Sequence, residues 1–63
     1  MERLKELRLE KGLTQKALGE QTKLSQSAIT YWETGKRIPN MLAIITLAKY
    51  FGVTTDYLLG VED

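Results

Sequence analysis

Apolar residues recur along this 63-residue chain at spacings of three and four, which is the period of an amphipathic helix. No stretch alternates apolar and polar residues as a half-buried strand does. Residues whose side-chain oxygen can cap a helix start are Thr14, Ser25, Asn40 and Thr54. Glycines suited to the position after a helix end are Gly12, Gly35, Gly52 and Gly60. We therefore expect an all-α fold with helices near residues 2–11, 15–22, 26–34, 41–51 and 55–59.

Each expected helix has one apolar face to bury. Helix 41–51 has the widest apolar stripe, so we expect it at the centre of the core; the stripe consists of Met41, Ile44, Ile45, Leu47, Ala48 and Phe51. Helix 2–11 contributes Leu4 and Leu7, together with the stems of Arg8 and Lys11. The other candidate core residues are Leu13, Leu18, Leu24, Ile29, Trp32, Ile38, Val53, Leu58 and Leu59.

Length and composition limit the possible functions. A chain of 63 residues makes one small domain at most, so we treat residues 1–63 as a single domain. The absence of Cys and His removes disulfides, the usual zinc ligands and the usual general base. The longest unbroken apolar run, residues 41–45, is too short for a membrane span or a signal peptide. We expect a soluble cytoplasmic protein that is not an enzyme, with no metal, cofactor or small-molecule ligand.

The segment 26–34 has a polar face of unusual composition. When it is wound at about 100° per residue, Ala28, Ile29 and Trp32 lie on one side. The other side carries Gln26, Ser27, Thr30, Tyr31 and Thr34, none of which is charged. Gln, Ser and Thr can address base edges in a DNA major groove, which admits an α-helix. Short polar helices are also common on protein surfaces, so this face alone leaves both interpretations open.

The residues before this helix change the balance between the two interpretations. Residues 15–34 read as a helix, a short turn and a second helix, which is the helix-turn-helix pattern. Gly19 lies in the middle of the first helix, where it costs about 1 kcal/mol relative to Ala, so we expect it to permit a close helix crossing. Residues 12–37 carry four basic and two acidic residues, whereas residues 38–63 carry one basic and three acidic residues. The helix-turn-helix pattern therefore lies in the more basic part of the chain.

Three stretches of the chain together resemble the lambdoid repressor and Cro-like regulators, the Xre family of helix-turn-helix proteins. They are LKELRLEKGLTQKAL, LSQSAITYWETGKRIP and LAKYFGVTTDYLL, in the order and spacing of the family. The resemblance implies a compact five-helix, lambda repressor-like domain of bacterial or phage origin. It further implies a transcriptional repressor that binds double-stranded operator DNA as a homodimer, with helix 26–34 in the major groove.

The resemblance also assigns roles to individual residues. The residues that match base-reading positions are Gln26, Ser27 and Thr30. Those that match DNA-backbone positions are Gln15, Tyr31, Thr34, Lys36 and Arg37, and Gln15 would also brace helix 26–34. Arg8 and Glu33 match an ion pair inside the domain. Helix 55–59 and the segment after it are the expected dimer contact, through Thr55, Tyr57 and Leu58.

Two residues in the turn of the motif depart from the family pattern. Thr22 stands where many relatives have an apolar residue, and Lys23 where many have glycine. Lysine tolerates the left-handed backbone conformation less well than glycine. Either the turn takes a slightly different path, or Lys23 accepts a strain of about 1 kcal/mol.

A second class of function stays open, because one fold can serve several functions. A domain of this kind can act as a protein-interaction or antitoxin-like module, with Leu9, Leu42 and Tyr57 as a contact surface. Such a module has no need for a polar face beside Lys36 and Arg37. This combination favours DNA as the partner.

Overall fold

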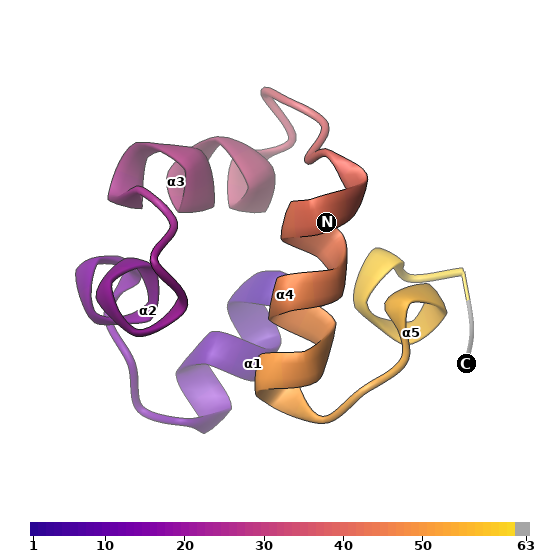
Figure 1. Ribbon diagram of the computed structural model, residues 1–63, viewed down its shortest axis with the longest axis horizontal. Helices are drawn as coiled ribbons and strands as arrows, with labels where there is room; N and C mark the ends of the chain where they lie inside the picture. Colours follow the sequence, from indigo (N-terminus) through magenta and orange to yellow (C-terminus); the bar gives the residue numbers. More distant parts are fainter. Residues whose placement is uncertain (62–63) are drawn as a thin grey trace.

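The computed structural model describes residues 1–61 of the chain. These residues form five helices, which are α1 (Leu4–Glu10), α2 (Gln15–Thr22), α3 (Gln26–Thr34), α4 (Met41–Phe51) and α5 (Thr55–Leu59). No strand occurs within residues 1–61, and the all-α prediction is confirmed (Figure 1). The predicted dimer contact after residue 59 extends to residues 62 and 63, which lie outside the described residues.

Side-chain caps set the starts of four helices where the sequence predicted them. The Thr14 hydroxyl accepts a hydrogen bond from the Ala17 backbone N–H at 3.0 Å. Equivalent caps at α3, α4 and α5 are made by Ser25, Asn40 and Thr54. Each cap stabilises its helix by about 1 kcal/mol. α1 is shorter than the predicted 2–11, since Arg3 before it makes no capping bond and Lys11 is its C-terminal cap.

Helices α2 to α5 each end on a residue in the left-handed conformation. For α3, α4 and α5 this residue is glycine, with φ of 77°, 70° and 81°. For α2 it is Lys23, with φ 61° and ψ 29°. Lys23 is the only non-glycine residue at positive φ in the part of the chain that the structure describes. The turn therefore keeps the left-handed geometry, and Lys23 bears a strain of about 1 kcal/mol.

The core lies where the five helices meet, with α4 at its centre as predicted. The fully buried side chains are Leu4, Leu18, Ile29, Leu47 and Leu58. The remaining buried hydrophobic residues are Trp32, Ala43, Ile44 and Ala48. α4 contributes more of this core than any other helix. Burial of apolar surface on this scale is the main stabilising contribution to such a domain.

Three residues predicted for the core lie on the surface instead. Ile38 is 94% exposed, Met41 68% and Ile45 37%. Ile38 belongs to the loop before α4, where helical periodicity does not apply. On α4 the apolar stripe is wider than the surface that the neighbouring helices cover, so Met41 and Ile45 remain at its edge. Lys11 is likewise exposed.

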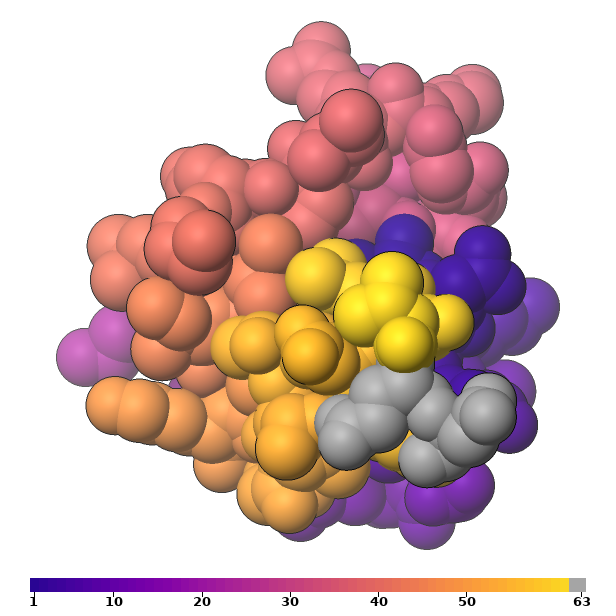
Figure 2. Space-filling model, turned by 90° about the vertical axis from the view of Figure 1, so that its right-hand side faces the viewer, coloured from indigo at the N-terminus to yellow at the C-terminus, as the bar shows by residue number. Residues whose placement is uncertain are grey.

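The beginning of the chain closes the fold on the side opposite α2. Figure 2 shows α5 and the residues after it (yellow) between α4 (orange) and the N-terminal residues (indigo). The Arg3 backbone N–H donates to the Leu58 carbonyl at 3.2 Å. The Met1 amino group donates to the Trp32 carbonyl at 2.8 Å. α2 and α3 lie on the opposite side of the molecule from α5 (Figure 1).

Candidate nucleic-acid interface

The turn between α2 and α3 brings the two helices too close for any side chain at Gly19. A Cβ atom at this position would lie 2.7 Å from the Leu24 carbonyl oxygen and 3.3 Å from the Gln26 backbone nitrogen. The Leu24 N–H donates to the Gly19 carbonyl at 2.9 Å. The predicted packing role of Gly19 is therefore confirmed, and it fixes how α3 is presented.

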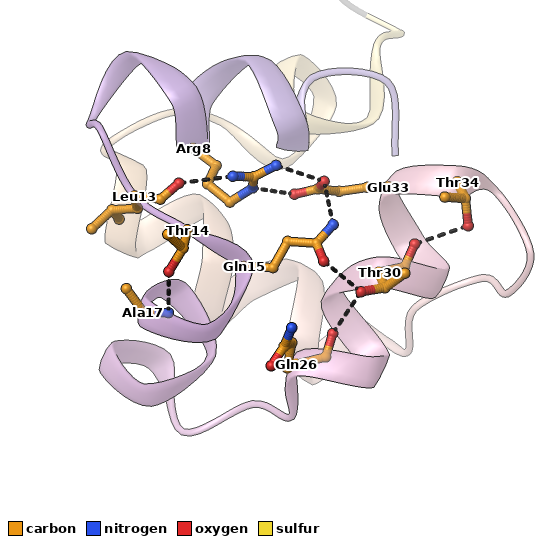
Figure 3. A network of polar contacts seen from close by, with 9 residues as sticks. All are labelled: Arg8, Leu13, Thr14, Gln15, Ala17, Gln26, Thr30, Glu33 and Thr34. Atoms are coloured by element: carbon orange, nitrogen blue, oxygen red, sulfur yellow. Dashed lines mark hydrogen bonds and ion pairs between the residues drawn. The ribbon is translucent and has the colours of Figure 1, made fainter.

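Arg8 and Glu33 form the expected ion pair between α1 and α3. Arg8 Nε donates to Glu33 Oε2 at 2.7 Å, and Nη2 donates to Oε1 at 3.1 Å (Figure 3). Nη1 donates to the Leu13 carbonyl at 2.7 Å, a third contact that the sequence did not reveal. The two charged side chains are only 9% and 3% exposed. One guanidinium thus joins α1, the turn after it and α3.

The surroundings of this pair favour its charged form. Burial alone raises the pKa of Glu33, but hydrogen bonds from Arg8 and Gln15, with the positive charges of Arg8 and Lys5, lower the pKa below its usual value. The hydrogen bond to Glu33 raises the pKa of Arg8, against the opposing effect of burial. Glu33 is therefore an ionised carboxylate, which only accepts hydrogen bonds.

Gln15 extends this network from the ion pair to the exposed side of α3. Its Nε2 donates to Glu33 Oε1 at 3.0 Å, and its Oε1 accepts from the Thr30 hydroxyl at 2.6 Å (Figure 3). The same hydroxyl lies 3.1 Å from the Gln26 carbonyl oxygen, a second acceptor. Gln15 therefore braces α3, as the family resemblance implied. The link to Thr30 depends on how two helices approach each other, and sequence spacing alone gave no signal for it.

The outward face of α3 presents unused hydrogen-bonding groups. Gln26 and Ser27 are exposed, and within residues 1–61 their side chains make no hydrogen bond. Gln26, Ser27, Thr30 and Tyr31 line a hollow of about 230 Å³. The Thr34 hydroxyl, one turn further on, donates to the Thr30 carbonyl at 2.9 Å. The three predicted base-reading residues thus lie together on one surface.

The two basic residues after α3 lie beside this face. Lys36 and Arg37 are both exposed, and their backbone N–H groups donate to the Tyr31 carbonyl at 2.9 and 3.5 Å. The Arg37 guanidinium lies 4.9 Å from the centre of the Tyr31 ring, a cation–π contact that the sequence had not indicated. The positive charge therefore lies in the loop directly after α3, which is hydrogen-bonded to the last turn of that helix.

The three residues predicted for the dimer contact differ in accessibility. Thr55 and Tyr57 are half-buried, and the Arg3 guanidinium lies 4.6 Å from the centre of the Tyr57 ring. Leu58 is fully buried in the core. In this conformation Thr55 and Tyr57 keep some accessible surface, whereas Leu58 packs within its own chain.

Residues 1–61 contain neither a membrane-spanning helix nor a cluster of metal-binding side chains. No helix there combines the length and the apolar character needed to cross a lipid bilayer. No group of three or more Asp, Glu, His or Cys side chains in the same residues is placed to hold a metal ion.

Comparison with known proteins identifies the family. The sequence matches the helix-turn-helix family over residues 4–58. It is 47% identical over 62 residues to the HTH-type transcriptional activator BcrR of Enterococcus faecalis, covering 98% of this chain and 30% of that protein. It is 34% identical over 61 residues to the HTH-type transcriptional regulator ImmR of Bacillus subtilis, covering 97% of this chain and 48% of that protein. No solved structure gives a significant match.

The match includes both helices of the motif and the whole of α4. The chain spans about half or less of the length of these two relatives. As the sequence predicted, the family is one of DNA-binding regulators and not of enzymes. The chain therefore belongs to the Xre, or lambda repressor-like, family of helix-turn-helix transcriptional regulators.

Proposed function

We propose that this chain is the DNA-binding domain of a transcriptional repressor, which places α3 in the major groove of operator DNA. The observation that carries the proposal is that one helix carries the unused polar groups of Gln26 and Ser27 at its start and holds the basic residues Lys36 and Arg37 at its end. Phosphates attract the positive charges, and base edges match the polar groups. The bacterial relatives support a cytoplasmic site of action.

The family resemblance and the exposed position of α3 support the following roles for individual residues. Gln26 begins α3 and reaches furthest into the groove, where it can bond to both N6 and N7 of adenine. Ser27 and Thr30 contact neighbouring bases. The residues that contact the DNA backbone are Gln15, Tyr31, Thr34, Lys36 and Arg37.

The proposed active form on DNA is a homodimer. A single α3 offers few base contacts, so tight binding requires two domains on half-sites about 34 Å apart. Thr55 and Tyr57 on the accessible side of α5 are the proposed contact between subunits. This arrangement requires an operator with inverted half-sites.

Selection of bound sequences from a random DNA pool tests the proposal. We expect enrichment of an inverted repeat, with half-site centres separated by about one helical turn. A variant with both Gln26 and Ser27 replaced by Ala is the matched control, because it alters the polar face and keeps the basic loop. Failure to enrich any sequence at low salt would instead favour a protein-interaction module, for which the exposed Leu9 and Leu42 offer apolar surface.

The direction of regulation needs its own experiment. The BcrR relative is named an activator. We propose repression because occupancy of an operator that overlaps a promoter is sufficient to block transcription, whereas activation needs a further surface for the polymerase. The selected operator, placed over a reporter promoter, should lower expression when this chain is present. Increased expression would reverse the assignment.

A further inference from the structure

We propose that the Thr30 hydroxyl acts toward DNA only as a hydrogen-bond acceptor, so that it selects an exocyclic amino group, adenine N6 or cytosine N4. The buried Arg8–Glu33 pair sets this preference by fixing the direction of each hydrogen bond between the core and Thr30. This inference rests on the proposed function and names what one residue of that interface recognises.

The Arg8–Glu33 ion pair sets the direction of the first hydrogen bond in the network that leads to Thr30. The guanidinium of Arg8 has donors and no acceptor, and the carboxylate of Glu33 has acceptors and no donor. The Gln15 amide lies 3.0 Å from Glu33 Oε1. Only its NH₂ end makes a favourable contact there, because its oxygen would face a negatively charged oxygen. The orientation of the amide is therefore fixed, with Oε1 turned toward α3.

The fixed orientation of the Gln15 amide limits the hydrogen bonds that the Thr30 hydroxyl can make. Its Oγ1 lies 2.6 Å from Gln15 Oε1 and 3.1 Å from the Gln26 carbonyl oxygen. Both neighbours are acceptors, and a hydroxyl has a single proton to donate. The proton therefore stays within the protein whichever acceptor takes it. Thr30 can offer a ligand a lone pair and its methyl group.

The major groove offers two kinds of partner for that lone pair. Adenine N6 and cytosine N4 carry donors, whereas guanine O6, thymine O4 and the purine N7 atoms are acceptors. An acceptor placed against the Thr30 lone pair is repelled. Ser27 differs because its hydroxyl makes no hydrogen bond within residues 1–61, so it can donate or accept. Two hydroxyl side chains on one face thus differ in what they select.

The test begins with DNA selection by the wild-type protein and by Thr30→Val. Valine keeps the shape and a methyl group and lacks the hydroxyl, so a difference in base preference locates the hydroxyl contact. The amino group at that base pair is then replaced by hydrogen in synthetic DNA, and the affinities of both proteins are measured. We expect this replacement to weaken wild-type binding by about 3- to 10-fold more than binding of the valine variant.

Two controls separate the contact from general effects. Removing the keto oxygen of the same base pair should affect both proteins equally. Thr30→Ser should keep the dependence on the amino group, because it retains the hydroxyl. Equal melting temperatures would show that all three proteins compared are folded to the same extent. If Thr30→Val melts lower, the comparison of wild type with Thr30→Ser still tests the proposal, since both must lose affinity when the amino group is removed.

Each outcome decides one of the two proposals. If removal of the keto oxygen weakens wild-type binding more than binding of Thr30→Val, the acceptor assignment is wrong although the domain reads DNA. The same conclusion follows if wild type and Thr30→Val show the same base preference at every position. If wild type enriches no sequence, the proposed function itself fails and the acceptor assignment with it.

Discussion

Gln26 is exposed, and its side chain makes no hydrogen bond in the part of the chain that the structure describes. Gln26→Ala should therefore melt at the wild-type temperature. It should lose discrimination at one base position of each half-site, because a bidentate contact from Gln to adenine is worth about 1–3 kcal/mol. Fluorescence anisotropy with a panel of single-base operator variants measures both affinity and preference. An equal loss of affinity for every operator would contradict a reading role for Gln26.

Arg8 and Glu33 should show strong energetic coupling. Removing one partner leaves a buried charge uncompensated, so Arg8→Ala and Glu33→Ala should each lower the free energy of unfolding by about 3–5 kcal/mol. The double variant should lose less than the two single changes added together. Urea denaturation of the four proteins in a double-mutant cycle measures the coupling, and strict additivity would show that the pair does not act as a unit.

The Arg8–Glu33 pair also predicts that the stability of the folded domain depends on pH in the acid range. The pKa of Glu33 is lower in the folded protein than its usual value, so the unfolded chain binds the proton more readily. The contribution of Glu33 is complete above the ordinary Glu pKa of about 4.3, and it is lost as the pH falls through the lower folded pKa. Glu33→Gln should show a flatter fall in melting temperature across this window than wild type. Melting temperatures that fall equally with pH in wild type and in Glu33→Gln would contradict this role of Glu33.

The sequence predicted which side chains share the exposed face of α3 but not how that face is connected to the core. The spacing of Gln26, Ser27 and Thr30 on one helix is enough to place them on one face. The link from Glu33 through Gln15 to Thr30 joins residues 15 and 18 positions apart, and it depends on the approach of α2 to α3. Periodicity within one helix carries no information about such an approach.

The turn between α2 and α3 offers a way to stabilise the domain. Lys23 occupies a left-handed position where glycine is unstrained, so Lys23→Gly should raise the free energy of unfolding by about 0.5–1 kcal/mol. Lys23→Ala is the control, because it removes the charge and keeps a Cβ atom. Chemical denaturation compares the three proteins. A gain in the alanine variant equal to that of the glycine variant would attribute the effect to charge rather than to backbone strain.

Helix positions were predictable because their signals are local. A capping side chain and a terminal glycine act within one turn of the helix, so α3, α4 and α5 have the predicted bounds. Which part of a wide apolar stripe becomes buried depends on neighbouring helices. For that reason Ile44 was placed correctly in the core, whereas Met41 and Ile45 were not.

The whole molecule carries a net charge of only +1, yet its basic residues are in excess before residue 38. Lys36→Ala and Arg37→Ala should therefore weaken binding to all DNA sequences alike, and each should reduce the salt dependence by about one unit of slope. Affinity measured over a series of salt concentrations, on specific and random DNA, gives both quantities. Lys49→Ala is the matched control, because it removes one positive charge from the last turn of α4, at the end of that helix far from α3 (Figure 1). An altered base preference with an unaltered salt slope would contradict the assignment.

The network from Arg8 to Thr30 bears on how such a domain acquires a new target sequence. Gln26 and Ser27 make no hydrogen bond within residues 1–61, so substitutions there can accumulate one at a time without loss of folding. Thr30 shares its proton with Gln15, which in turn holds the carboxylate of Glu33. A change at Thr30 leaves a partner unsatisfied unless Gln15 changes as well. A new target sequence should therefore be acquired through single substitutions at Gln26 and Ser27. At Thr30 it should require a paired substitution of Gln15.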